Sequence, residues 1–206
     1  SVTDGNGKVT TYEYNSDLDV TRKVDANGNV TEWAYAGPDR PSVQTTYGVD
    51  QTGASAAQYT RYAYDAEGHL RFIVSPQGQV TQYTYTASGQ ILTKRLYPQH
   101  TYPAGATPVS EAAVGAWLAG LGDLGSAQVV TYVYDARGNL VREEHHADTS
   151  AAGEGASTGV ITRVWYTYDQ AGQLLSTASD DEGAESFISD GLGRGVSRGN
   201  GWGGTT

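Results

Sequence analysis

The sequence predicts an all-β fold in which antiparallel β-hairpins of about 21 residues repeat along the chain. A pattern of two alternating tyrosines, an aspartate, a glycine and a leucine starts at Tyr62, Tyr132 and Tyr166 and keeps the same offsets each time. Such recurrence indicates a repeat architecture. The alternation itself is typical of a half-buried strand, and the 27 glycines suit the turns between strands. We therefore expect a curved or spiralling β-sheet strip or shell with one short helical insert.

The composition excludes several classes of protein. The 206 residues carry a net charge of −10 without a cluster of lysine and arginine, so a nucleic-acid partner is not expected. No cysteine is present, which excludes disulfides and thiolate metal sites. No apolar run reaches the length of roughly 20 residues that a membrane helix needs. The 15 tyrosines and 2 phenylalanines suit a sheet that is partly solvated.

Each unit is expected to hold two strands and two turns. The first unit runs through the strand that ends at Tyr14 and the strand 20–24 to a tight turn at Asn27 and Gly28, where glycine supplies a positive φ. The repeat signature that we assign comprises Tyr12, Tyr14, Trp33, Tyr35, Tyr62, Tyr64, Asp65, Gly68, Leu70, Tyr83, Tyr85, Gly89, Tyr132, Tyr134, Asp135, Gly138, Leu140, Tyr166, Tyr168, Asp169, Gly172, Leu174, Asp190 and Gly193. These positions predict architecture rather than chemistry.

The array divides into three parts: repeat units over 1–97, an insert rich in proline and glycine over 98–128, and further repeat units over 129–206. Within the insert, 110–121 is expected to form a helix that Ser110 caps. Its apolar face consists of Val114, Trp117, Leu118 and Leu121. Trp117 and Leu118 are expected to pack on the sheet, and Gly122 or Gly125 to end the helix.

Two further irregularities interrupt the repeats. The residues 36–41 replace a clean turn, and 147–159 is small-residue and polar, which predicts a loose surface loop. Ser1 and Thr206 both lie near broken units. Because exposed strand edges are templates for pairing, we expect neighbouring repeats of the parent chain or of another copy to continue the sheet.

The nine-residue pattern resembles the YD repeats of the Rhs and YD-repeat family, which includes Rhs polymorphic toxins, the BC subunits of Tc insecticidal toxins, and teneurins. Tyr62 to Leu70, Tyr132 to Leu140 and Tyr166 to Leu174 carry the resemblance most fully. The resemblance implies a long β-sheet strip that spirals into a hollow shell. In toxin members such a shell encloses a C-terminal effector.

The repeated aspartates Asp65, Asp135 and Asp169 have two interpretations. One is calcium binding, but calcium takes about six to eight oxygen ligands and each turn offers one carboxylate. The other is that each carboxylate accepts backbone N–H groups in its own turn, and this is the interpretation that we favour.

Two other groups of polar residues have the composition of sites. His145 and His146 stand beside Glu143, Glu144 and Asp148, but neighbouring residues of a strand point to opposite faces, which favours a solvated strand end over a metal site. Residues 180–182, Asp-Asp-Glu, offer paired carboxylates for glycoside chemistry, but at a turn they are more typical of solubility.

The strong motifs are strands and turns, so we expect no enzymatic activity, no metal and no cofactor. The expected function is structural: a wall segment of a secreted or cell-surface β-shell or filament, which in a toxin would enclose a polypeptide cargo. The alternative is an adhesin or recognition module that binds glycans or a surface partner through exposed aromatic residues such as Trp33, Tyr62 and Tyr83. A third hypothesis is an enzyme that uses Asp180 and Asp181.

Overall fold

A computed structural model describes residues 1–47, 57–103, 105–156, 159–180, 183–189 and 195–200. The chain forms two compact units, Ser1–Gln82 with Pro98–Leu121 (unit 1) and Tyr83–Tyr97 with Gly122–Thr206 (unit 2). The boundary between the units crosses two strands. The predicted positions Asp190 and Gly193, and the acidic residues Asp181 and Glu182, lie outside the described residues.

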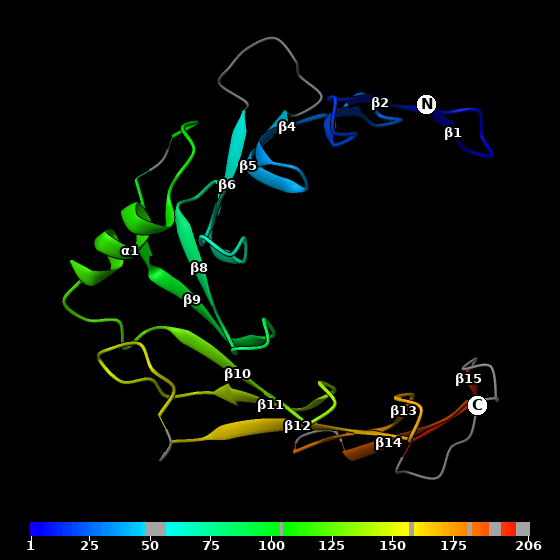
Figure 1. Ribbon diagram of the computed structural model, residues 1–206, viewed down its shortest axis with the longest axis vertical. Coiled ribbons are helices and arrows are strands. Elements are labelled where there is room, and N and C mark those ends of the chain that lie inside the picture. The colour runs from blue at the N-terminus through cyan, green and yellow to red at the C-terminus, as the bar shows by residue number, and fades with distance from the viewer. Residues whose placement is uncertain (48–56, 104, 157–158, 181–182, 190–194, 201–206) are drawn as a thin grey trace. The chain divides into compact units, whose positions relative to one another are not determined.

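The sheet of unit 1 follows the order of the chain, and neighbouring strands are antiparallel (Figure 1). Its strands are β1 (Val2–Thr3), β2 (Val9–Tyr14), β3 (Val20–Val24), β4 (Val30–Gly37), β5 (Arg40–Tyr47), β6 (Gln58–Tyr64), β7 (Leu70–Val74) and the first part of β8 (Gln79–Tyr85).

Unit 2 repeats this arrangement. Its strands are the first part of β9 (Ile91–Thr101), β10 (Gln128–Tyr134), β11 (Leu140–His146), β12 (Ile161–Tyr168), β13 (Leu174–Ser179), β14 (Gly183–Ser189) and β15 (Gly195–Asn200). From β9 to β15 each strand pairs antiparallel with the next. The predicted all-β fold of antiparallel hairpins with one short helix is thus confirmed. No helix within the described ranges is both long and apolar enough to cross a membrane.

A β-bulge accompanies each repeat signature. The pairing shifts register just before the second tyrosine, which then lies opposite the leucine of its own repeat: Tyr64 opposite Leu70, Tyr134 opposite Leu140, and Tyr168 opposite Leu174. A bulge places an extra residue on one strand and increases the local twist. The signature therefore marks the place where each hairpin bends into its turn.

The strand β5 was not predicted. Residues 36–41 were expected to disrupt the array, but β4 and β5 form a hairpin around Pro38 and Asp39. Pro41 is tolerated because it stands near the start of β5, opposite Tyr35, where the register shifts on both sides. Tyr35 and Tyr64 are thus separated by two strands, β5 and β6, as in a regular unit.

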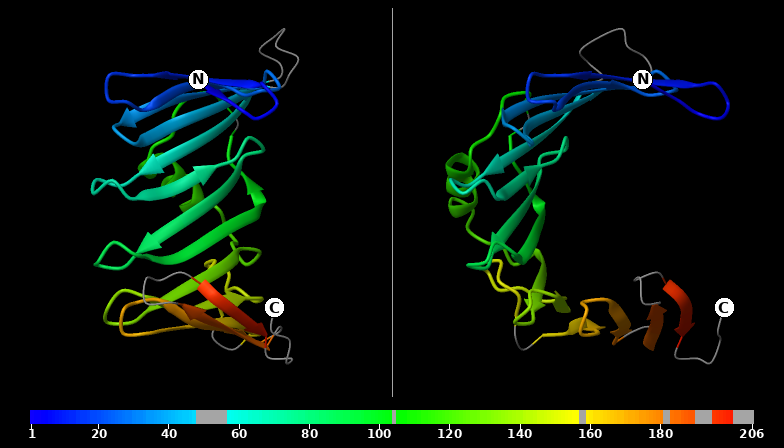
Figure 2. Two further views of the ribbon diagram at one scale, coloured as in Figure 1. Left: turned by 90° about the vertical axis from the view of Figure 1, so that its right-hand side faces the viewer. Right: turned by 45° about the vertical axis from the view of Figure 1, so that its right-hand side comes forward.

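The core of unit 1 lies on one face of its sheet. Arg61, Ala63, Phe72, Val74 and Val80 are all buried. Across the strands Arg61 faces Val74, Ala63 faces Phe72, and Val74 faces Val80. Since side chains two residues apart share a face, the signature tyrosines of β6 lie on the other face. Figure 2 shows the helix on a single face of this sheet.

The helix α1 (Glu111–Ala119) begins as predicted, because the Ser110 side chain accepts a hydrogen bond from the Ala113 N–H. It ends earlier than predicted, at Gly120, whose N–H bonds to the carbonyl of Ala116. The buried contacts also differ in part. Val114 and Leu118 are the buried residues, whereas Trp117 is half-buried.

Trp117 packs against an aromatic residue of the insert itself. Its ring lies edge-on to that of Tyr102, with ring centres 5.2 Å apart. The strand β9 continues to Thr101, past residue 97 after which the insert was expected to begin. The insert therefore begins as an extension of a sheet strand.

The second insert is not a loose loop over its described residues. The Ala156 N–H bonds to the Asp148 carbonyl, Thr149 forms a β-bridge with Gly155, and a tight turn joins Ser150 to Glu154. This hairpin lies over the buried Tyr97, and Glu154 forms an ion pair with Arg95. The small residues of this segment predicted a loose surface loop, whereas in the structure they allow close packing.

Candidate functional site: the aspartate turns and the tyrosine bonds between repeats

Nine tight turns in the described part of the chain share one backbone pattern. The first residue of each turn donates its N–H to the carbonyl four residues later, over 2.8–3.0 Å, and accepts a bond from the N–H three residues later, over 2.8–3.2 Å. The first residues are Asp4, Asn15, Asp25, Asp65, Ser75, Thr86, Asp135, Ser150 and Asp169. The fourth residue has a positive φ, which explains why it is glycine in all turns except the one at Leu18.

The side chain of the first residue completes the turn. Asp135 Oδ1 accepts the backbone N–H groups of Arg137 and Asn139, each over 2.9 Å, and Oδ2 accepts the Asn139 side chain over 3.0 Å. Asp169 Oδ1 accepts the N–H groups of Ala171 and Gln173 in the same way. The carboxylates thus act as acceptors within their own turns.

These bonds favour the charged form of the carboxylates. The pKa of Asp135 is lowered, first by the Asn139 side chain and then by the backbone N–H of Asn139. Burial acts to raise the pKa of Asp65, but hydrogen bonds from His69 and the positive charges of His69 and Arg71 outweigh it, and the pKa is lowered. The turns at Asp65 and Asp135 therefore stabilise the charged form of their own carboxylates.

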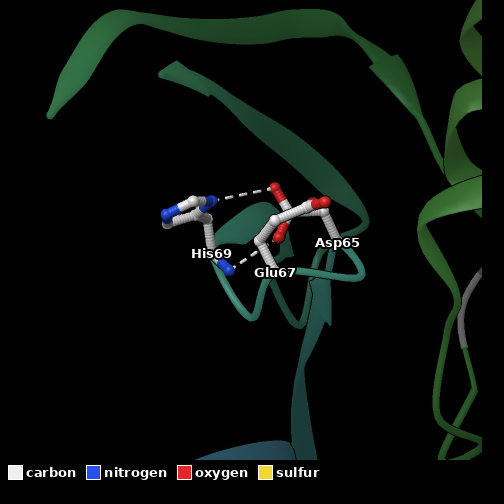
Figure 3. A group of neighbouring side chains, drawn as sticks. All are labelled: Asp65, Glu67 and His69. Atoms are coloured by element: carbon white, nitrogen blue, oxygen red, sulfur yellow. Dashed lines mark hydrogen bonds and ion pairs between the residues drawn. The ribbon is translucent and has the colours of Figure 1, made fainter. Parts of the chain in front are cut away.

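Asp65, Glu67 and His69 form a group in which potential metal-ligand atoms lie within 4.8 Å of one another (Figure 3). Protein donors already occupy Asp65. Its Oδ1 accepts the His69 N–H over 2.7 Å, and its Oδ2 lies 3.2 Å from His69 Nδ1. The group offers far fewer oxygens than the six to eight that calcium takes.

The two histidines of β11 have different surroundings. His145 Nε2 lies 3.4 Å from Glu143 Oε2, and its side chain is half exposed. The neighbouring His146 lies under the second insert, 3.2 Å from Thr131 Oγ1 and 3.3 Å from the Ala156 carbonyl oxygen. The expectation of a solvated strand end is therefore wrong for His146, because the insert covers its ring.

The acidic residues at 180–182 are represented by Asp180 alone in the described ranges. Its Oδ2 accepts the backbone N–H of Arg163 over 2.8 Å, and its own N–H bonds to the Arg163 carbonyl. Asp180 thus ends the pairing between strands, which is a structural role.

The second tyrosine of a signature bonds to the preceding repeat. Its hydroxyl donates to the first backbone carbonyl after the preceding turn. The four such bonds in the described residues run from Tyr35 to Val20 (2.7 Å), from Tyr64 to Pro41 (3.0 Å), from Tyr134 to Ile91 (2.9 Å) and from Tyr168 to Leu140 (2.9 Å). These inter-repeat tyrosine bonds join each turn to the next and were not foreseen from the sequence.

The first aromatic residue of a signature meets polar side chains. Trp33 Nε1 and the Tyr62 hydroxyl both donate to Gln44 Oε1, over 3.3 and 3.2 Å. The Tyr166 hydroxyl donates to Glu143 Oε1 over 3.1 Å. These aromatic side chains are half-buried, so their hydroxyl and indole groups have partners within the sheet.

An open hollow of about 610 Å³ lies between two successive turns of unit 2. Its lining comprises Asp135, Arg137, Asn139, Val141, Tyr166, Thr167, Tyr168, Asp169 and Gln170. Arg137 connects the two turns, because its Nη1 donates to the Gln170 carbonyl oxygen over 3.1 Å. The hollow is the space that the repeat geometry leaves between neighbouring turns.

The raised pKa of Tyr166 predicts that the protein loses stability at alkaline pH. Burial, the negative charge of Glu143 and the bond to it raise its pKa from 10.0 to about 12. Between these values the unfolded chain releases a proton that the folded chain keeps, so the free energy of unfolding falls as pH rises. Tyr166→Phe should flatten this fall in urea unfolding above pH 10, and the exposed Tyr14→Phe should not. An unchanged slope in Tyr166→Phe would contradict the assignment.

Comparison with known proteins identifies the repeat. Residues 64–107 match the model of the RHS repeat. The crystal structure of TcdB2-TccC3 without its hypervariable C-terminal region matches with a TM-score of 0.54 and 15% identity, over 93% of this chain and 9% of that chain. The Photorhabdus luminescens Tc holotoxin pore matches with a TM-score of 0.44 and 16% identity, over 92% and 11%. No curated protein sequence matches.

The first structural match shows a shared fold, and the second is too distant to add to it. The chain spans only 9% of the TcdB2-TccC3 chain that it matches. An open array of antiparallel repeat hairpins is the class that the fold defines. The RHS repeat match and the shared fold support the YD/Rhs-repeat family for this chain.

Proposed function

We propose that the chain is a structural segment of one continuous YD-repeat array, interrupted by the insert, and that it forms part of the wall of a secreted or cell-surface shell around a polypeptide. The observation that carries this proposal is the set of inter-repeat tyrosine bonds, from Tyr35, Tyr64, Tyr134 and Tyr168. The repeats of Tyr35 and Tyr134 supply both a donor to the preceding repeat and, at Pro41 and Leu140, a carbonyl to the following one. Further repeats can extend the sheet through the same bonds, as the wall of a shell requires.

Glycan recognition is the second candidate. The hollow beside Tyr166 and Tyr168 combines aromatic rings with carboxylate and amide groups, which are the groups that sugars contact. The two hydroxyls are already bonded to Glu143 and Leu140, however, which favours the structural role.

The structural role is tested in the full parent protein. Changing Tyr35, Tyr64, Tyr134 and Tyr168 together to Phe removes four bonds, each of which stabilises by about 0.5–1.5 kcal/mol. We expect the parent protein to protect a polypeptide outside the repeats from limited proteolysis, and the fourfold variant to lose that protection. The exposed Tyr14→Phe is the control. If that polypeptide is digested in the native, unaltered parent protein as fast as in the parent protein unfolded in urea, the proposal that the shell encloses it is wrong.

A further inference from the structure

Arg61 is an unusual residue for the centre of a strand. It lies in the middle of β6 and is only 3% exposed. The residues opposite it on the two neighbouring strands are Val43 and Val74, which are 5% and 0% exposed. Arginine is almost never buried to this extent without a partner of opposite charge.

The partners of Arg61 are neutral. Its Nη1 donates to the Pro103 carbonyl oxygen over 3.0 Å, and its guanidinium lies 5.4 Å from the centre of the Tyr102 ring. Its Nε is buried without a hydrogen-bond partner. These contacts explain how the insert is attached to the sheet, but they leave the charge uncompensated.

Five other arginines of the described chain are paired with carboxylates. Those with ion pairs are Arg22, Arg71, Arg95, Arg142 and Arg163. Arg95 is the nearest match to Arg61, since its side chain is 13% exposed and bonds to Glu154. Within the described residues no ion pair is found for Arg61, although it is the most buried of these arginines. Burial also lowers its pKa, which shows the cost of keeping the charge without water.

A cavity of about 480 Å³ adjoins Arg61. Its other lining residues include Gln58, Tyr59, Pro76 and Gln77, none of which is acidic. Gln58 and Gln77 are exposed, so polar side chains border the cavity, and the buried Arg61 contributes to its lining. This is the arrangement that a small anion would complete.

We propose that this cavity is a binding site for a carboxylate, which pairs with the Arg61 guanidinium. Guanidinium presents several N–H donors in a planar fork that matches the two oxygens of a carboxylate. The carboxylate comes either from an acidic side chain of a polypeptide or from a free small acid. Attachment of the insert and binding of the anion thus depend on the same side chain.

The experiment observes the Arg61 and Arg95 Nε–H signals by nuclear magnetic resonance in the complete 206-residue chain. The probes are sodium acetate and an end-blocked Gly-Glu-Gly peptide, each compared with sodium chloride at equal ionic strength. We expect the Arg61 signal to shift in a saturable way and the paired Arg95 signal to stay in place. A response to the peptide at concentrations where acetate gives none would identify a polypeptide carboxylate as the ligand. A response to acetate at concentrations where the peptide gives none would identify a free acid.

Arg61→Lys keeps the charge but loses the planar fork of N–H donors, so we expect it to bind the carboxylate at least about tenfold more weakly. Binding to this variant is measured from the shifts of the Tyr59 and Gln77 backbone signals. Arg61→Met should abolish binding. If either variant is misfolded, the responses of the Arg61 and Arg95 Nε–H signals in the unaltered chain still decide whether the cavity binds a carboxylate. No saturable Arg61 shift with either probe, or an equal response to inorganic phosphate, would overturn a carboxylate site.

Discussion

Gly78→Ala should destabilise unit 1 by about 3 kcal/mol or more, the largest effect that we expect from a single methyl group. Gly78 has a φ of +81°, which costs a residue with a side chain about 1–2 kcal/mol. A Cβ there would also lie 2.5 Å from the Tyr102 carbonyl oxygen and 2.6 Å from Thr101 Cγ2. The Tyr102 N–H bonds to the Gly78 carbonyl over 2.8 Å, so the insert cannot move away without losing this contact.

The control is Gly7→Ala. Gly7 occupies the same position of the same kind of turn with a φ of +77°, but no atom lies within 4 Å of its added Cβ. It therefore reports the backbone cost alone, about 1–2 kcal/mol. The difference between the two variants measures the close approach of the insert.

Urea unfolding and hydrogen exchange of the Tyr102 amide provide the measurements. We expect Gly78→Ala to increase Tyr102 exchange strongly and Gly7→Ala to leave it unchanged. Equal destabilisation by both variants would mean that the insert does not rest on this turn.

The turns and strands could be predicted because their causes are local. An aspartate, a glycine three residues later and alternating tyrosines determine a hairpin over a few residues, so Asp65, Asp135 and Asp169 pointed to their own turns. The start of α1 is local as well, since Ser110 caps it three residues from its donor.

The remaining features depend on residues far apart in the chain. Arg61 resembles any strand arginine until Pro103, 42 residues away, covers it. Residues 36–41 predicted only an irregular turn, because the place of Pro41 in β5 depends on a bulge opposite Tyr35. The spacing of the second tyrosines was visible in the sequence, but their hydrogen-bond acceptors were not. The acceptors are backbone carbonyls of another repeat, which do not depend on the identity of the residue.

Leu118→Ala should cost unit 1 about 2–5 kcal/mol, because the side chain is 6% exposed and its removal leaves a cavity beneath α1. The insert contributes to the buried face that contains Phe72 and Val74, so the effect should extend to the strands β6 and β7. We expect faster hydrogen exchange in both strands as well as in 111–119.

Leu18→Ala is the matched control in the same unit. Leu18 is 80% exposed, and because alanine keeps the Cβ, the positive φ of 69° is equally unfavourable before and after the change. Its effect should stay within about 0.5 kcal/mol. Faster exchange confined to 111–119 in Leu118→Ala would show that the helix merely rests on the sheet. Faster exchange in β6 and β7 as well would show that the insert stabilises the repeats, since the buried face is then shared between the two.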